Sequence, residues 1–575
     1  MQNASSGSQI IRFGTFELDV RAGELRKQGA RIRLQEQPLR ILEMLLAHPG
    51  QLVTREELRD RLWPSDTFVD FDHGLNKAIN KLREALDDSA ENPRFVETIP
   101  RRGYRMLAPL GKAAGRIESL AVLPLENLSD DPAQEYFADG MTEALITSLG
   151  HISALRVTSR ITAMTYKGAH KSVPEIAREL GVDGIVAGTV LRSKGRVRIS
   201  AQLISTHDDT LVWAESYERN ARDILELQAE LARAIAAEIR AKLTPREEAQ
   251  LARTRPAVNP EAYEAYLLGR YWWVRRSAEG LKKGAEYFRQ AIDKDPAFAP
   301  AHVGLADVAS SAGYWGFAPP AEACGKAKVL ARKSLEIEET GEARAALGWA
   351  LVLYDYDFAA AEKELQRAIA LYPDYVFAHM WYGMCLAYAG RLEEGLTETR
   401  RALQLDPLSP IVHVCYGAVI LFLRDWDGGI DHCRSALEIN PDYSPVRWQL
   451  ANALQLKGSH EEAVRERQRV IDAAPGSVMF LAELGDSYAA AGMRSDALRV
   501  LDQLHELRGH KYVMAYWMAL IHAGLRERDE AFRWLDTALE ERSAHLAFVR
   551  VDWRLDYLRP DPRFQNLLDR MRPAR

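Results

Sequence analysis

Two neighbouring segments near the N terminus carry side chains suited to reading duplex DNA. The stretch from Phe71 to Leu86 repeats its apolar residues at the 3.6-residue period of one helix face, and its polar side chains gather on the opposite face. Amide, imidazole and lysine groups at this spacing can hydrogen-bond to base edges in a major groove. We therefore expect base contacts from His73, Asn76, Lys77 and Asn80.

The second segment, from Phe95 to Met106, predicts two short strands joined by a tight basic turn. Such a turn places arginines at an exposed tip, from which a guanidinium can reach the phosphates of the neighbouring groove. Around this tip and the end of the helix we expect phosphate contacts from Lys81, Arg83, Arg94, Thr98, Arg101 and Arg102. The competing interpretation is a solvated amphipathic helix with no partner.

The elements that must position these groups come before them in the chain. Residues 10–33 alternate polar and apolar with turn residues between, which predicts a small antiparallel sheet. A first helix opens near Pro38. Thr54 with Glu57 three residues later is a capping box, and the helix that it starts should run to about Leu62. Sheet, three helices and a terminal hairpin predict a winged helix-turn-helix.

Residues 10–110 closely resemble the OmpR/PhoB-type DNA-binding domain, and the run PRFVETIPRRGYR from Pro93 to Arg105 is highly specific for it. The resemblance implies that the helix from Asp72 to Leu86 enters the major groove. It also implies that the Arg101–Arg102 turn contacts the minor groove or its phosphates, and that the loop from Trp63 to Asp70 can touch RNA polymerase.

This segment departs from the family in two ways. Response regulators carry a phosphorylatable receiver domain before the module, whereas only a short polar leader, residues 1–9, precedes it here. The module is thus the output domain of a phosphorelay-type family in a one-component arrangement. Asn80 stands where relatives often have arginine on the reading face, so a different target sequence is expected. The N-terminal placement resembles the CadC/ToxR branch, but a linker over 111–117 takes the place of a transmembrane helix.

Alternating strand and helix patterns over 118–220 predict a compact α/β domain with a mixed sheet. The run AVLPLENLS from Ala121, with EYFADG from Glu135, resembles the TolB-like module that often lies between a signalling domain and tetratricopeptide repeats. Its glycine-rich run, Gly181 to Gly188, lacks the Lys-Ser/Thr of a P-loop. Because no nucleophile–base motif occurs either, we expect no enzyme and no cofactor. A connecting helix over 221–255 should follow.

Residues 256–575 form an array with a 34-residue period. Small or apolar residues recur at one helix position, and a second small-residue column lies seven residues upstream of it. The first column comprises Ser334, Ala368, Ala402, Ala436, Val470, Leu504 and Ala538. This period is the tetratricopeptide signature. It predicts about eight helix pairs, nine extra residues at Ala312–Pro320, a capping helix near 564–571, and a concave face that binds a protein or peptide.

Composition limits the remaining possibilities. The net charge of −6 over 575 residues gives no global attraction to nucleic acid, so DNA binding must rest on a local patch. That patch is itself close to charge-balanced, which favours a homodimer or tandem sites on DNA. None of the four cysteines forms a C-x-x-C pair, and we expect no metal site. The leader lacks signal-peptide features and no apolar run could span a bilayer, so a cytoplasmic protein without membrane contact is expected.

The predicted fold class is a multidomain α+β chain: a winged helix-turn-helix, then a compact α/β domain with a mixed sheet, then an all-α tetratricopeptide superhelix. The favoured function is a sequence-specific, DNA-binding, one-component transcription regulator whose repeats bind a protein or peptide. Two alternatives stay open. One is an interaction scaffold without specific DNA binding, and the other is an enzyme whose chemistry resides in residues 117–220.

Overall fold

The computed structural model describes the chain from Ile10 to Met571 apart from several short gaps and one longer gap. The described residues are 10–13, 16–27, 30–63, 71–86, 88–90, 93, 95–100, 102–107, 110–111, 117–129, 131, 134–152, 154–169, 171–193, 195–207, 209–220, 223–239, 258–275 and 277–571. They form two compact units, one over 1–116 with 207–210 and one over 117–206 with 211–575.

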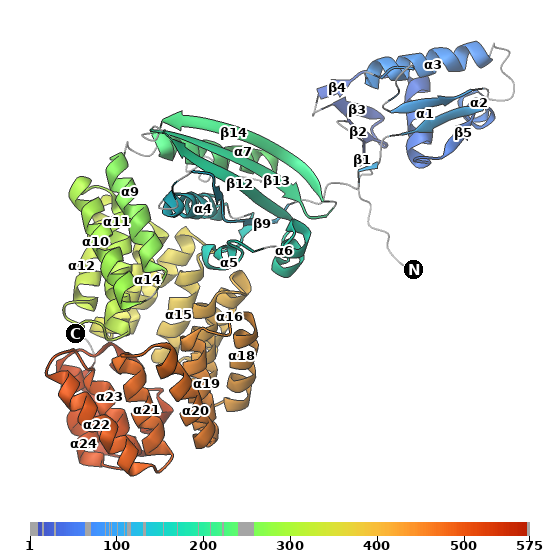
Figure 1. Ribbon diagram of the computed structural model, residues 1–575. Coiled ribbons are helices and arrows are strands. Elements are labelled where there is room, and N and C mark those ends of the chain that lie inside the picture. The colour runs from blue at the N-terminus through green and yellow to red at the C-terminus, as the bar shows by residue number, and fades with distance from the viewer. Residues whose placement is uncertain are drawn as a thin grey trace. The chain divides into compact units, whose positions relative to one another are not determined.

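The first unit has the predicted order of sheet, three helices and hairpin (Figure 1). Its first sheet has the order β4-β3-β2-β1-β8 and is antiparallel throughout, with strands β1 (Ile10–Phe13), β2 (Phe16–Asp19), β3 (Glu24–Lys27), β4 (Ala30–Ile32) and β8 (Leu110–Gly111). Helices α1 (Glu36–Ala47), α2 (Arg55–Leu62) and α3 (Phe71–Leu86) follow. The second sheet has the order β5-β7-β6, from β5 (Leu52–Thr54), β7 (Gly103–Met106) and β6 (Val96–Ile99).

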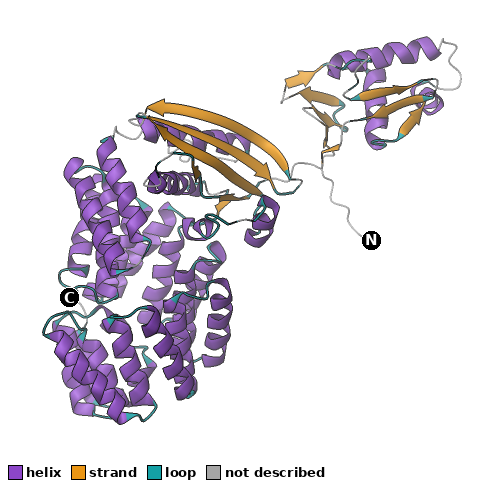
Figure 2. Ribbon diagram, viewed as in Figure 1, coloured by secondary structure: helices purple, strands orange, loops and turns teal. Residues whose placement is uncertain are grey.

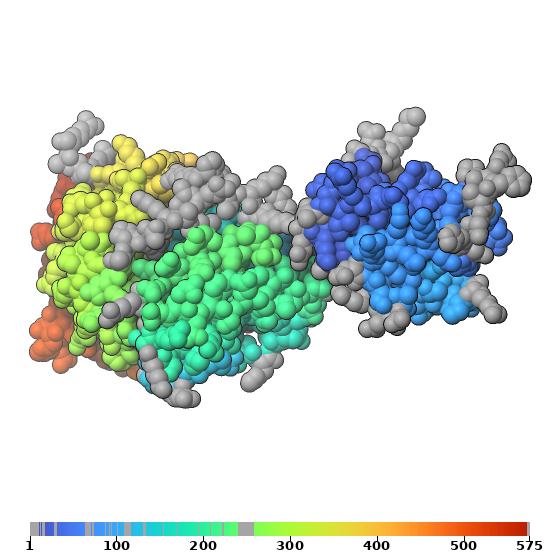
Figure 3. Space-filling view, turned by 90° about the horizontal axis from the view of Figure 1, so that it is seen from above, coloured from blue at the N-terminus to red at the C-terminus, as the bar shows by residue number. Residues whose placement is uncertain are grey.

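The apolar stripes of the three helices meet in one core between the two sheets. Leu42 and Leu45 of α1 are fully buried with Leu82 of α3, and they pack with Phe13 and Phe16 of the first sheet. The space-filling view shows the described residues up to Gly111 packed together, in blue (Figure 3). The predicted capping box is confirmed: Thr54 and Glu57 exchange hydrogen bonds and so fix the start of α2.

The second unit begins with the predicted mixed sheet, of order β11-β9-β12-β13-β14 (Figure 2). Parallel pairs join β9 (Ser119–Val122) to β11 (Arg156–Val157) and to β12 (Gly184–Ser193), which also pairs with β10 (Glu126–Asn127). The long strands β12 and β13 (Arg196–Ser205) are antiparallel, and β14 (Thr210–Asn220) lies at the edge. Helices α4 (Glu135–Gly150) and α7 (Ile224–Glu238) cover one face, with the short α5 (Arg160–Met164) beside α4, while α6 (Val173–Leu180) lies by the other.

The predicted helix pairs are confirmed over the described part of the repeats (Figures 1 and 2). The first helices of the pairs are α9 (Pro260–Trp273), α11 (Ala299–Tyr314), α13 (Gly341–Ala350), α15 (Val376–Tyr388), α17 (Pro410–Phe422), α19 (Ser444–Lys457), α21 (Val478–Ala490) and α23 (Ala515–Gly524). The second helices are α10 (Ala278–Lys294), α12 (Cys324–Ile337), α14 (Phe358–Leu371), α16 (Leu392–Leu405), α18 (Trp426–Ile439), α20 (His460–Ala473), α22 (Arg494–Arg508) and α24 (Arg528–Glu540). The capping helix is α25 (Pro562–Arg570).

Three features of the second unit were not predicted. A π-helical turn, η3 (Leu351–Asp355), extends α13. Two 3-10 turns, η4 (Ala544–Phe548) and η5 (Trp553–Leu558), lie between the last repeat and α25.

No helix within the described residues combines the length and the apolar character that crossing a membrane requires.

Candidate nucleic-acid interface

The polar face of α3 is exposed as predicted. The side chains of Asn76, Lys77 and Asn80 all face solvent, while Leu75, Ala78 and Ile79 on the other side of the helix are buried. His73 belongs to the same row of α3 by its position, but its side chain lies outside the described residues. Spacings of three and four residues put the exposed groups on one strip of the helix surface, where they can face one groove of a duplex.

Asn76 is held in place by groups from two other elements. Its side-chain oxygen accepts a hydrogen bond of 3.2 Å from Arg55 of α2 and one of 3.0 Å from the hydroxyl of Tyr104 on β7. Arg55 also donates to the Tyr104 hydroxyl at 3.1 Å, which closes a triangle of contacts. Because the oxygen is taken up, the NH₂ group of Asn76 is the part left to donate to a base acceptor. Sequence reasoning missed both Arg55 and Tyr104.

The end of α3 is tied to the segment before α1. The ammonium group of Lys81 donates to the side-chain oxygen of Gln35 at 2.6 Å, and the lysine is half-buried. No carboxylate among the described residues pairs with Lys81, and an amide oxygen carries no net charge, so the positive charge is not neutralised by this bond. Lys81 therefore stays in the proposed phosphate-contacting set.

Arg83 has a different position from the one predicted for a phosphate contact. Its side chain is only 6% exposed and points into the domain. Its guanidinium donates to the backbone oxygen of Val96 at 2.7 Å and to the hydroxyl of Thr98 at 2.8 Å, so it joins α3 to strand β6. A phosphate contact would have to break both bonds, and we therefore remove Arg83 from the proposed contact set.

The hairpin β6–β7 is formed as predicted, with Ile99 paired to Gly103 next to its turn. The side chain of Arg102 is exposed, while its backbone N–H donates to Ile99 and its carbonyl accepts from Arg55. Thr98 is exposed on β6. Three predicted features lie outside the described residues: Arg94, Arg101 and the loop 64–70 after Trp63.

Gly103 lets the hairpin lie close against β5. A Cβ atom at this position would be 2.1 Å from the backbone oxygen of Val53 and 2.9 Å from the Cα of Thr54. We expect Gly103→Ala to force these strands apart and to cost about 1–3 kcal/mol of domain stability, as overpacking does. Faster hydrogen exchange of the α3 and hairpin amides in the full chain would show it. Arg102→Ala, in the same turn but exposed, is the control and should leave exchange unchanged.

The inner face of the repeats is the other predicted site, and the chain itself fills part of it. Residues 543–558, which we call the inner segment, contain η4 and η5. Turn η4 contacts the first helices α11 and α15, and η5 contacts the first helix α23. The hydroxyl of Tyr356 donates to the backbone oxygen of Ser543, and Phe548 packs on Tyr388. The inner segment therefore fills part of the concave face that the repeats were predicted to form.

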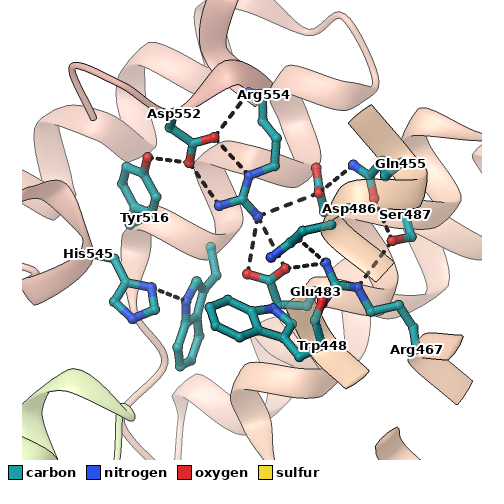
Figure 4. Close-up of polar contacts among 12 residues, drawn as sticks. Trp448, Gln455, Arg467, Glu483, Asp486, Ser487, Tyr516, His545, Asp552 and Arg554 are labelled. Carbon is teal, nitrogen blue, oxygen red and sulfur yellow. Dashed lines mark hydrogen bonds and ion pairs between the residues drawn. The ribbon is translucent and has the colours of Figure 1, made fainter. Parts of the chain in front are cut away.

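A buried polar network fixes the inner segment to the last repeats (Figure 4). Arg554 of η5 lies 3.2 Å from both oxygens of Glu483 on α21 and 2.8 Å from Asp552. Asp552 accepts from the hydroxyl of Tyr516 on α23. Glu483 is also paired with Arg467 of α20, whose side chain is fully buried. Burial alone would raise the pKa of Glu483, but the two guanidinium groups outweigh it and lower that pKa to about 2.

Asp486 is the weakly compensated carboxylate of this network. Burial raises its pKa to about 6 and Glu483 adds to the rise, although Arg554, 3.7 Å away, acts in the opposite direction. A pKa raised by folding means that this group stabilises the native state in acid and loses that contribution as pH rises through about 6. Compared with the unaltered chain, we expect Asp486→Asn to raise the urea midpoint more at pH 8 than at pH 4.5. Asp442→Asn, at an exposed site, should show no such difference between the two pH values.

Two histidines lie side by side on α17 and α18, next to a buried cysteine. His413 and His432 stack at 5.0 Å, and burial raises the pKa of the neighbouring Cys433 thiol to about 12. No group of three or more metal-ligating side chains occurs within the described residues. Cys433 is thus buried as a protonated thiol, which is typical of structural cysteines.

Comparison with protein families divides the chain in the same way. Residues 29–106 match the family described as "Transcriptional regulatory protein, C terminal". Residues 116–234 match the second domain of HilA/YgeH-like transcriptional regulators, in the segment where the sequence resembles a TolB-like module. The two family models together include α1–α3, the hairpin and the mixed sheet.

Individual relatives share parts of the chain. A putative adenylate cyclase 3 of Rhizobium meliloti is 38% identical over 33% of this chain and 32% of its own length. A cholera toxin homolog transcriptional activator of Vibrio parahaemolyticus is 34% identical over 20% of this chain and 41% of its own length. The transcriptional regulator HilA of Salmonella typhimurium is 22% identical over 67% of this chain and 68% of its own length.

The chain thus spans less than half the length of the first two relatives. The first family model matches the residues that form the three helices and the hairpin. The second family model matches the residues that form the mixed sheet. The 34-residue helix pairs identify the remainder. The chain therefore carries an OmpR/PhoB-type winged-helix domain, followed by a HilA/YgeH-like second domain and tetratricopeptide repeats.

Proposed function

We propose that this chain is a sequence-specific DNA-binding transcription regulator of the one-component kind. The observation that carries the proposal is the exposed row Asn76, Lys77 and Asn80 on α3, with Asn76 held by Arg55 and Tyr104. An amide fixed in this way loses little freedom on binding, so its hydrogen bond to a base contributes more to specificity. The names of the HilA and cholera toxin homolog relatives support a role in transcription.

In this proposal α3 lies in the major groove, and the hairpin β6–β7 lies over the adjacent backbone. Asn76, Lys77 and Asn80 contact bases together with His73, and Lys81, Thr98 and Arg102 contact phosphates together with Arg94 and Arg101. The segment 63–70 is proposed to touch RNA polymerase, and a homodimer on DNA would supply affinity that one charge-balanced domain lacks. The predicted linker 111–117 is shortened at both ends, because Gly111 belongs to β8 and Ile117 to the second unit.

Mapping of the DNA bound by the tagged full chain in cells tests the proposal. It predicts a limited set of sites that share one short motif and that disappear in an Asn76→Ala, Asn80→Ala variant. Even coverage of the genome, or an unchanged set of sites in that variant, would favour the scaffold alternative instead. The prediction that the chain is not an enzyme stays open to a direct assay of ATP turnover, which the name of the Rhizobium relative makes the natural choice.

A further inference from the structure

The nine-residue insertion Ala312–Pro320 extends the end of α11, which runs to Tyr314, and its remaining residues form a turn before α12. Gly316 in this turn has a positive φ of 71°, and a Cβ there would lie 2.5 Å from the indole of Trp517. The backbone N–H of Phe317 donates to Ala312 at 2.8 Å. The turn is thus anchored on its inner side by Trp517 of α23, while the ring of Phe317 remains 45% exposed.

Beside this turn lies an open groove of about 650 Å³ between α10 and α12, with α11 as its floor. Leu281 of α10 and Val308 of α11 supply buried apolar surface, and Val329 of α12 is 64% exposed at the edge. An apolar strip that combines Val329 and Phe317 is unusual for the outer helices of a repeat array, whose exposed face is normally polar. The groove is therefore a candidate binding surface.

The groove also has a positive rim. It is lined by three cations, Lys282 and Arg289 of α10 and Lys326 of α12. The acidic side chain in the same lining is Glu322. Among the described residues, no ion pair is found for these three cations, whereas many other arginines of the repeats are paired. A partner with carboxylates on either side of an apolar strip would complement both the floor and the rim.

We propose that this outer groove binds an acidic amphipathic helix of a partner protein. The cations lie on the two helices that form the groove walls, and the apolar groups lie between them, which is the arrangement that receives one helix face. A nucleic acid would use the cations but would leave the apolar side chains of Phe317 and Val329 exposed to water. That this contact regulates transcription rests on the function proposed above.

Fluorescence anisotropy with the full chain tests the proposal. The probe is a labelled helical peptide with leucines along one face and glutamates beside them, and its matched peptide has lysines in place of the glutamates. We expect the acidic peptide to bind at least about tenfold more tightly than the basic one. Val329→Glu should weaken acidic-peptide binding by about tenfold or more. Leu498→Glu, at an exposed apolar site of α22, is the matched control and should leave it unchanged.

A charge swap gives a second readout that does not depend on the apolar floor. Lys282→Glu combined with Lys326→Glu should invert the preference between the two peptides. Equal binding of both peptides, or full binding by Val329→Glu, would overturn the proposal. Self-association that Val329→Glu abolishes, or duplex binding that the charge swap abolishes, would also overturn it. Lys77→Glu should keep peptide binding, so a failure of the DNA proposal is distinguishable from a failure of this one.

Discussion

Arg554→Met is expected to lower the free energy of unfolding of the repeat array by about 3–5 kcal/mol, the usual cost of removing one partner of a buried ion pair. The substitution would leave Glu483 and Asp552 as buried carboxylates with one cation, Arg467, still beside the first of them. The inner segment would lose its charged anchor to α21. Urea unfolding of the full chain, followed by circular dichroism of the helical signal, measures the change.

Two further variants make that expectation specific to the network. Arg499→Met removes an exposed ion pair to Asp496 on α22 and should cost no more than about 1 kcal/mol. Adding Asp552→Asn to Arg554→Met should restore part of the lost stability, because Asp552 loses its cation in Arg554→Met and its uncompensated charge is then removed as well. Equal losses in Arg499→Met and Arg554→Met would mean that burial of the network has no energetic consequence.

Lys77→Glu is expected to weaken binding to a mapped DNA site by about 10–100-fold. A lysine that contacts the duplex releases counterions on binding, so its loss should also reduce the log–log salt slope by about 0.9. Asn80→Ala should behave differently. It removes a neutral base contact worth about 1–3 kcal/mol, so the preference for the site should fall while the salt slope stays the same.

Arg40→Ala is the matched control for the lysine variant. Arg40 is an exposed cation of α1 that pairs with Glu36, away from the polar strip of α3. It should change neither affinity nor slope. If Arg40→Ala and Lys77→Glu had the same small effect, the strip on α3 would not be the surface that binds DNA.

Local sequence signals were sufficient for most of the fold. The capping box at Thr54 and Glu57 and the 34-residue period are both encoded within short stretches of sequence. The helix predicted from Asp72 to Leu86 begins one residue earlier, at Phe71. Patterns of this kind predict helices, turns and repeats because each pattern depends only on the residues of one turn, one helix or one repeat.

The role of individual polar residues could not be predicted in the same way. Arg83 appears as a surface cation in its helix, and only the position of Val96 shows that it is buried. The contacts of Asn76 with Arg55 and Tyr104 join three separate elements. The inner segment has no repeat period, so its place among α11, α15 and α23 depends on the curvature of the whole array. These features depend on tertiary contacts between segments far apart in the sequence.

The most direct test of the central claim is a salt titration of the full chain with a mapped duplex and with a scrambled duplex of equal length. The account predicts tighter binding to the mapped duplex at every salt concentration, with affinity for both falling linearly on a log–log scale. It also predicts that Asn76→Ala with Asn80→Ala brings the two affinities together. Equal affinity of the unaltered chain for both duplexes would contradict the claim that α3 reads sequence.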